Sequence, residues 1–273
     1  MNLFGLDASL VALLLAMGCV AGFLAGLLGI GGGMLLVPAM TYVGTRGGFD
    51  PSYVVKMAVA TSLSTIVFTS ISSVRAHHRK GAVRWDLAAR LAPGIVVGSV
   101  LGALVAKSLP ASVLALCFAG FTGYSAVQML VDRKPRPSRQ LPGTAGLSGM
   151  GGLIGGLSAL VGAGGAFISV PFMVWCNVPI HTAVATSAAL GFPIAAAGTL
   201  GYWWAGWQLP VAPPGAVGFI YLPALALIAC TSVLLAPVGA AAAHRLDRAK
   251  LKRVFAVLLF GLASYMVHRA VSL

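Results

Sequence analysis

Two glycine-rich stretches of almost the same pattern decide how this chain folds: LLGIGGGMLLVP at residues 27–38 and LVGAGGAFISVP at residues 160–171, 133 positions later. They lie in the two longest apolar runs, at about 9–43 and 142–175. A single helix over the 35 residues of the first run would be about 50 Å long, whereas the hydrocarbon core of a bilayer is about 30 Å thick. Glycine and proline interrupt helices. Each run therefore predicts a helix, a break at the glycines, and a second helix or half-helix that turns back.

The composition indicates that the chain lies in a membrane. Of the 273 residues, 59 % are hydrophobic and 8 % are charged. From residue 140 to residue 244 there is no Asp, Glu, Lys or Arg over 105 positions, and a water-facing surface could hardly avoid all four, which excludes a large soluble core. The four cysteines stand singly, without Cys-x-x-Cys spacing, and are interpreted as packing residues. We therefore predict an all-α, polytopic membrane protein.

The basic loops predict the sidedness of the chain. Six further apolar segments are expected to cross the membrane, at about 54–74, 86–106, 111–131, 180–204, 214–243 and 249–267. Short cytoplasmic loops are enriched in Lys and Arg. With Arg90 counted in the first, three clusters hold 14 of the 18 Lys and Arg residues and are placed inside: 75–84, 132–139 and 244–253. The loop at 203–214 has none and is placed outside. The run at 142–175 must then begin and end inside, which a single crossing cannot do.

The glycine stretch opens a longer repeat. AVATS follows at residues 58–62 and again at 183–187, and LGALVAKSLP at 101–110 aligns with VGAAAAHRLD at 238–247. A returning long run plus three single crossings gives each half an odd number of passes, so the second half is predicted to be inverted relative to the first. Such inverted repeats with broken helices are typical of secondary transporters. The predicted division is a first repeat at 1–132, a basic cytoplasmic linker at 133–141 and a second repeat at 142–273.

Gly-x-Gly-Gly followed by Val-Pro and then by Ala-Thr-Ser, all of it duplicated, resembles the TauE/SafE family of sulfite exporters, also called the four-transmembrane sulfite uptake or export permeases. The resemblance covers nearly the whole chain. It implies a multi-pass protein of the bacterial inner membrane that transports small anions: sulfite, sulfonates such as sulfoacetate, or other small organic or sulfur-containing anions. Family membership does not fix the substrate.

The residues themselves also favour an anion. A half-helix that begins after tandem glycines presents unpaired backbone N–H groups and the positive end of its dipole, which attract an anion without a cationic side chain. The hydroxyls of AVATS could add donors. The alternatives are tight packing of small residues for the glycines and bonding to their own helix for the hydroxyls. The predicted substrate-binding residues are Gly31, Gly32, Gly33, Thr61, Ser62, Gly164, Gly165, Thr186 and Ser187.

Two ionisable residues occupy equivalent places in the repeat. Lys56 and His181 each lie two residues before AVATS, which puts them on opposite sides of the predicted membrane. A charge at a helix entrance could attract the anion or gate its path. Snorkelling to the interface is the alternative for Lys56, and a satisfied interfacial position is the alternative for His181.

The predicted function is secondary transport of a small anion. Export is favoured because the inside-negative potential is worth about 2.3 kcal/mol per charge per 100 mV. Glu is absent and the five Asp lie at segment ends, so no mid-membrane carboxylate is available for coupling. A channel-like pore and proton coupling through His181 are the alternatives.

No enzyme, cofactor or metal motif is found. The basic residues behind the net charge of +13 lie mainly in the three loops predicted to be cytoplasmic. Membrane topology therefore accounts for the charge, which argues against nucleic-acid binding. The expected partners are the bilayer and the anion, and a homo-oligomer is left open.

The sidedness can be tested with a single cysteine. We expect Arg136→Cys, in a chain whose native cysteines are replaced by alanine, to be labelled by a membrane-impermeant maleimide only after the cells are opened. Labelling of intact cells from the periplasmic side would contradict the inverted arrangement of the two halves.

Overall fold

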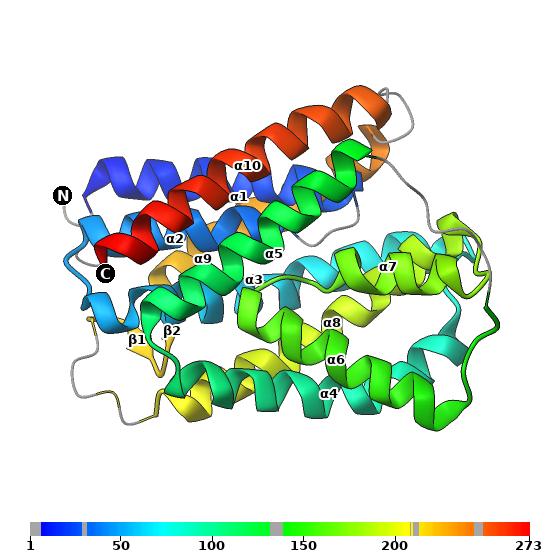
Figure 1. Ribbon diagram of the computed structural model, residues 1–273. Coiled ribbons are helices and arrows are strands. Elements are labelled where there is room, and N and C mark those ends of the chain that lie inside the picture. Colours follow the sequence, from blue (N-terminus) through cyan, green and yellow to red (C-terminus); the bar gives the residue numbers. More distant parts are fainter. Residues whose placement is uncertain (1–6, 29–31, 132–138, 208, 210–212, 243–247) are drawn as a thin grey trace.

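The computed structural model describes residues 7–28, 32–131, 139–207, 209, 213–242 and 248–273. In this part of the chain there are ten helices and one short β-hairpin (Figure 1). Eight of these helices are long and apolar enough to cross a membrane. The prediction of an all-α, polytopic membrane protein is confirmed at this level.

The helices follow the predicted apolar segments closely. The first half contains α1 (Ala8–Leu28), α2 (Gly33–Arg46), α3 (Pro51–Arg79), α4 (Trp85–Ser108) and α5 (Ala111–Val131). The second half contains α6 (Thr144–Val161), α7 (Ala166–Trp175), α8 (Ile180–Ala205), α9 (Leu222–Ala242) and α10 (Arg248–Ser272). The segment expected at 214–243 begins differently, because β1 (Ala216–Val217) and β2 (Ile220–Tyr221) pair as an antiparallel hairpin before α9.

Both long runs are broken at their glycines, as predicted. Helix α1 ends before the glycines and α2 begins after them, while residues 162–165 separate α6 from α7. The second helix of each pair is short: α2 has 14 residues and α7 has 10, or about 21 Å and 15 Å. Figure 1 shows α7 running back toward the end of the molecule at which α6 begins. Each glycine break therefore starts a helix shorter than the hydrocarbon core.

Helices α3 and α8 form the centre of the molecule. In the most apolar window of α3, 83 % of the residues are buried, and in that of α8 67 %, against 39 % or less for the other spanning helices. Helix α3 packs directly on α8, α4 packs on α6, and α1 packs on α9. The two AVATS stretches lie on α3 and α8. The repeated motif thus belongs to the most buried pair of helices.

Glycine brings α4 and α6 into backbone contact. A Cβ on Gly98 of α4 would collide with the backbone of Gly152, and one on Gly151 of α6 would collide with the carbonyl of Leu91. A Cβ on Gly22 of α1 would likewise meet the backbone of Ser232 in α9. These glycines serve tight helix packing, which was the alternative interpretation of the glycine content.

The two ends of the molecule carry different elements. The start of α1, the end of α10 and the β-hairpin lie at one end (Figure 1). The junction of α3 and α4, the end of α5 and the start of α10 lie at the other. The three basic clusters adjoin this second group of helix ends. The arrangement agrees with one cytoplasmic side for all three, which stays a prediction.

The packing role of glycine in α6 has a matched control within the same helix. We expect Gly151→Ala to lower the melting temperature of the detergent-purified protein, because forced overpacking typically costs about 1–3 kcal/mol. Gly149→Ala should melt at the same temperature or slightly higher, since nothing lies within 4 Å of its Cβ and alanine favours the helix by about 1 kcal/mol. Equal melting of the two variants would show that the α4–α6 contact is not tight.

Candidate functional site

The two glycine breaks lie against each other at α3. The Ser62 hydroxyl donates to the Gly162 carbonyl at 3.0 Å and also lies 3.3 Å from the carbonyl oxygen of Gly33. A Cβ added to Gly33 would touch the Gly162 carbonyl. Segments 133 positions apart in the sequence therefore meet through one serine of the first AVATS. Gly31, another predicted site residue, lies outside the described part of the chain.

Each short helix begins at a glycine in the left-handed conformation. Gly32 precedes α2 with φ 68°, and Gly165 precedes α7 with φ 76°, in equivalent positions of the two stretches. Side chains with a Cβ rarely adopt this conformation, so both glycines are needed for folding. No side chain caps either helix. The first backbone N–H groups of α2 and α7 thus have no acceptor within their own helices.

Sequence reasoning missed one polar residue of this region, Ser158. It is fully buried in α6, and its hydroxyl lies 3.0 Å from where a Cβ on Gly165 would be. Within the described residues this hydroxyl has no hydrogen-bond partner. A buried hydroxyl without a partner is costly in an apolar interior and usually has a specific reason. The available signal was a lone serine in the last three turns of an otherwise apolar, glycine-rich segment.

The remaining space at the breaks is narrow. Ser187 pairs with Ser169 of α7 at 2.7 Å, and both are buried. Ser187 and Gly164 line a cavity of about 20 Å³. A second cavity of about 10 Å³ lies beside Gly32 and Phe167. Since a water molecule needs roughly 10–15 Å³ by this measure, neither of these two cavities between described residues is large enough for an anion.

Thr61 and Thr186 connect the central helices to the other half of the chain. The Thr61 hydroxyl accepts from the backbone N–H of Tyr221 at 3.0 Å, just before α9. The Thr186 hydroxyl accepts from the backbone N–H of Arg84 at 3.1 Å, just before α4. These partners lie outside the glycine breaks, and neither bond returns to the threonine's own helix. The two contacts occupy matching places in the predicted repeat.

Charge is sparse in the described structure. The one ion pair in the described ranges joins Arg84 to Asp86 at 2.6 Å on the exposed surface, and this hydrogen bond raises the pKa of the Arg84 guanidinium. The described ranges hold no cluster of three His, Cys, Asp or Glu side chains that could bind a metal. The described residues that line the two small cavities at the glycine breaks carry no charged side chain, so helix dipoles and hydroxyls are the groups there that could attract an anion.

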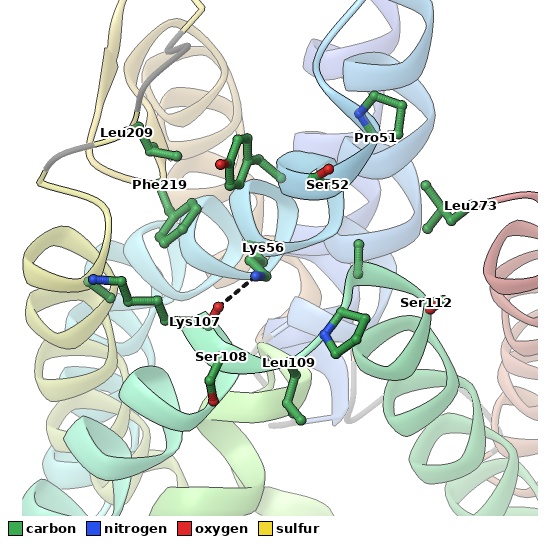
Figure 2. Close-up of a pocket in the computed structure, with 14 residues that line it drawn as sticks. Pro51, Ser52, Lys56, Lys107, Ser108, Leu109, Ser112, Leu209, Phe219 and Leu273 are labelled. Atoms are coloured by element: carbon green, nitrogen blue, oxygen red, sulfur yellow. Dashed lines mark hydrogen bonds between the residues drawn. The ribbon is translucent and has the colours of Figure 1, made fainter.

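Lys56 and His181 lie in different surroundings despite their equivalent places in the repeat. Lys56 is only 7 % exposed, and its ammonium donates to the Lys107 carbonyl at 2.7 Å. It lies within a cavity of about 580 Å³ (Figure 2), inside the protein instead of on its lipid-facing side. His181 is exposed at the start of α8 and has no hydrogen bond or ion pair to the described residues. Within the described residues, no hydrogen bond or ion pair joins either side chain to the glycine breaks.

Comparison with known proteins places the chain among transporters. A family model described as Sulfite exporter TauE/SafE matches residues 14–266. A probable membrane transporter protein of Haemophilus influenzae is 35 % identical over 257 residues, which cover 94 % of this chain and 97 % of that relative. The probable membrane transporter protein YunE of Bacillus subtilis is 27 % identical over 200 residues, covering 66 % of this chain and 73 % of YunE. No solved structure matches the chain significantly.

The hydrogen bond between Thr61 and Tyr221 can be tested separately from hydrogen bonds within a helix. We expect Thr61→Val to destabilise the protein by about 1–3 kcal/mol, because the buried N–H of Tyr221 loses its acceptor. Thr61→Ser should restore it. Thr65→Val is the control, since that buried hydroxyl bonds only to a carbonyl of its own helix, and it should cost less. Melting curves in detergent give the comparison. Equal losses of stability in the variants at positions 61 and 65 would show that the Thr61–Tyr221 hydrogen bond contributes nothing special.

Proposed function

Because the chain belongs to the TauE/SafE sulfite exporter family of membrane transporters, we propose that it carries small anions, such as sulfite, sulfonates or related organic anions, out of the bacterial cell across the inner membrane. The inside-negative potential drives a monovalent anion outward by about 2.3 kcal/mol per 100 mV. Export therefore needs no mid-membrane carboxylate, and the chain has none.

The observation that carries the proposal is the contact between the two glycine breaks. Helices α2 and α7 both begin there without side-chain caps, and the carbonyls of Gly33 and Gly162 share the Ser62 hydroxyl. Two positive helix ends, each equivalent to about half a charge, can compensate the desolvation of one anion. The Ser158 hydroxyl, which lacks a partner within the described structure, adds a donor at the start of α7.

The same contacts support an inverted-repeat architecture. The pairing of α4 with α6 is matched by the pairing of α9 with α1, and α3 pairs with α8 across the centre. The Thr61–Tyr221 bond is matched by the Thr186–Arg84 bond. Each half thus contributes one broken helix and one AVATS helix to a common centre. Transporters of this kind expose a central site alternately to the two sides.

A carrier explains the closed centre better than an open pore does. The spaces beside the two breaks are about 20 Å³ and 10 Å³, whereas the cavity at Lys56 is about 580 Å³. A carrier closes the path to at least one side in every state of its cycle, while a conducting pore needs a continuous path. Potential-driven export is preferred to proton coupling, because no described contact links the exposed His181 to the breaks.

Transport by Ser158→Ala tests the proposed site without harming the fold. Removal of a buried hydroxyl that makes no bond within the described structure should leave the melting temperature unchanged or slightly higher. If the hydroxyl contacts the anion, we expect potential-driven sulfite efflux from proteoliposomes to fall about tenfold. The loss of one hydrogen bond to a charged group has an effect of about this size.

Ser99→Ala is the matched control. Ser99 is also fully buried, and its hydroxyl also lacks a partner among the described residues, but it lies at the contact of α4 with Gly155 of α6. It should leave both melting and efflux unchanged. Equal efflux by the Ser158→Ala variant and the wild type would contradict the proposal that the anion binds at the start of α7.

A further inference from the structure

We propose that the cavity around Lys56 is a second anion-binding site, in which a small oxyanion acts as the counter-ion of the Lys56 ammonium. The site is distinct from the glycine breaks, because Lys56 lies six residues before Ser62, about 9 Å along α3. The inference rests on the proposed function for its biological meaning, since it gives the transported anion a place to bind at one end of its path.

Lys56 is a buried charge without a charged partner. Its side chain is 7 % exposed, and the contact of its ammonium in the described structure is the neutral carbonyl of Lys107. An ammonium has three donors, so two of them are left for a ligand. Burial without a charged partner is unfavourable for an ammonium, and an anion beside it would offset much of that cost.

Among the described residues that line the cavity, none has an acidic side chain that could play this part, and the charged side chains are those of Lys56 and Lys107. Asp50 precedes them in the chain, but its carboxylate accepts from the backbone N–H of Ser52 and caps α3. The acid nearest in sequence is thus already engaged. Leu273, the last residue of the sequence, also lines the cavity, but its carboxylate forms no ion pair with Lys56 in the described structure. A counter-ion from solution can therefore take this place.

The cavity also offers donors other than Lys56. The 21-residue helix α5 begins on its wall with Ala111 and Ser112, whose backbone N–H groups lie in the first turn and have no helical acceptor. The helix dipole adds a positive potential there. The Lys107 side chain is exposed to solvent, and the part of Lys107 that contacts Lys56 is its backbone carbonyl. Figure 2 shows Lys56 between the starts of α3 and α5, reaching to the Lys107 carbonyl.

The size of the cavity predicts how the anion binds. At about 580 Å³ it is far larger than a sulfite or sulfate ion, so the ion enters with part of its water shell. Binding should therefore depend on charge more than on shape, with sulfite and sulfate competing. The cavity lies where α3 and α5 begin, the end of the molecule predicted to face outward (Figure 1). An exported anion would bind there before its release.

Calorimetry with sodium sulfite tests the site on the full chain in detergent at low ionic strength. We expect Lys56→Met to lose one bound sulfite per chain or to weaken its binding at least tenfold, whereas Lys56→Arg keeps the affinity within about threefold. Lys107→Met is the control, because it removes an exposed lysine of the same cavity, and it should weaken binding less than threefold. Unchanged stoichiometry and affinity in Lys56→Met would overturn the proposal.

A second measurement uses the wild-type chain and does not depend on the folding of any variant. Sodium sulfate should slow the acetylation of Lys56 by N-acetoxysuccinimide at least threefold relative to the other lysines, as measured by peptide mass spectrometry. An unchanged relative rate would contradict the site. The Ser158→Ala variant separates the two proposals, because it should keep Lys56-dependent binding while losing efflux. Sulfite binding at Lys56 in a chain that transports no anion would refute the proposed function alone.

Discussion

A backbone group released inside a bilayer must find its partner within the protein, because no water is present to supply one. Breaking a membrane helix releases several such groups at once, so both breaks can exist only where other parts of the protein cover them. The contact of Gly33, Gly162 and Ser62 meets this requirement, since each break shields the other against α3. The deep burial of α3 and α8 follows from the same need.

The sequence predicted the breaks because their cause is local. Tandem glycines with a proline soon after them interrupt a helix wherever they occur, and a 35-residue apolar run is too long for one crossing. The helix bounds were predictable for the same reason. The hairpin at 216–221 was not, because two strands of two residues carry no periodic signal.

The roles of the polar residues were harder to predict, because each depends on a partner far away in the chain. Substrate binding by Thr61 and Thr186 stays a prediction, and their described bonds go to residues just before α9 and α4. Ser158 was missed because its isolation appears only once α6 and α7 are placed together. The predicted repeat aligns Lys56 with His181 along the chain, but one is buried in a cavity and the other is exposed. A repeat specifies equivalent positions, and the loops around them decide their surroundings.

The backbone contact between α4 and α6 shows that some glycines of this chain are sterically required, while other described glycines are not. At Gly98 and Gly151 even one added carbon would collide with a neighbouring main chain, so selection is expected to remove substitutions at these positions. At Gly120 and Gly149 the added carbon would meet nothing within 4 Å, so a substitution by alanine carries no steric penalty. Relatives of this chain can therefore lose many glycines without losing the fold, and glycine content alone is a poor guide to how closely their helices approach.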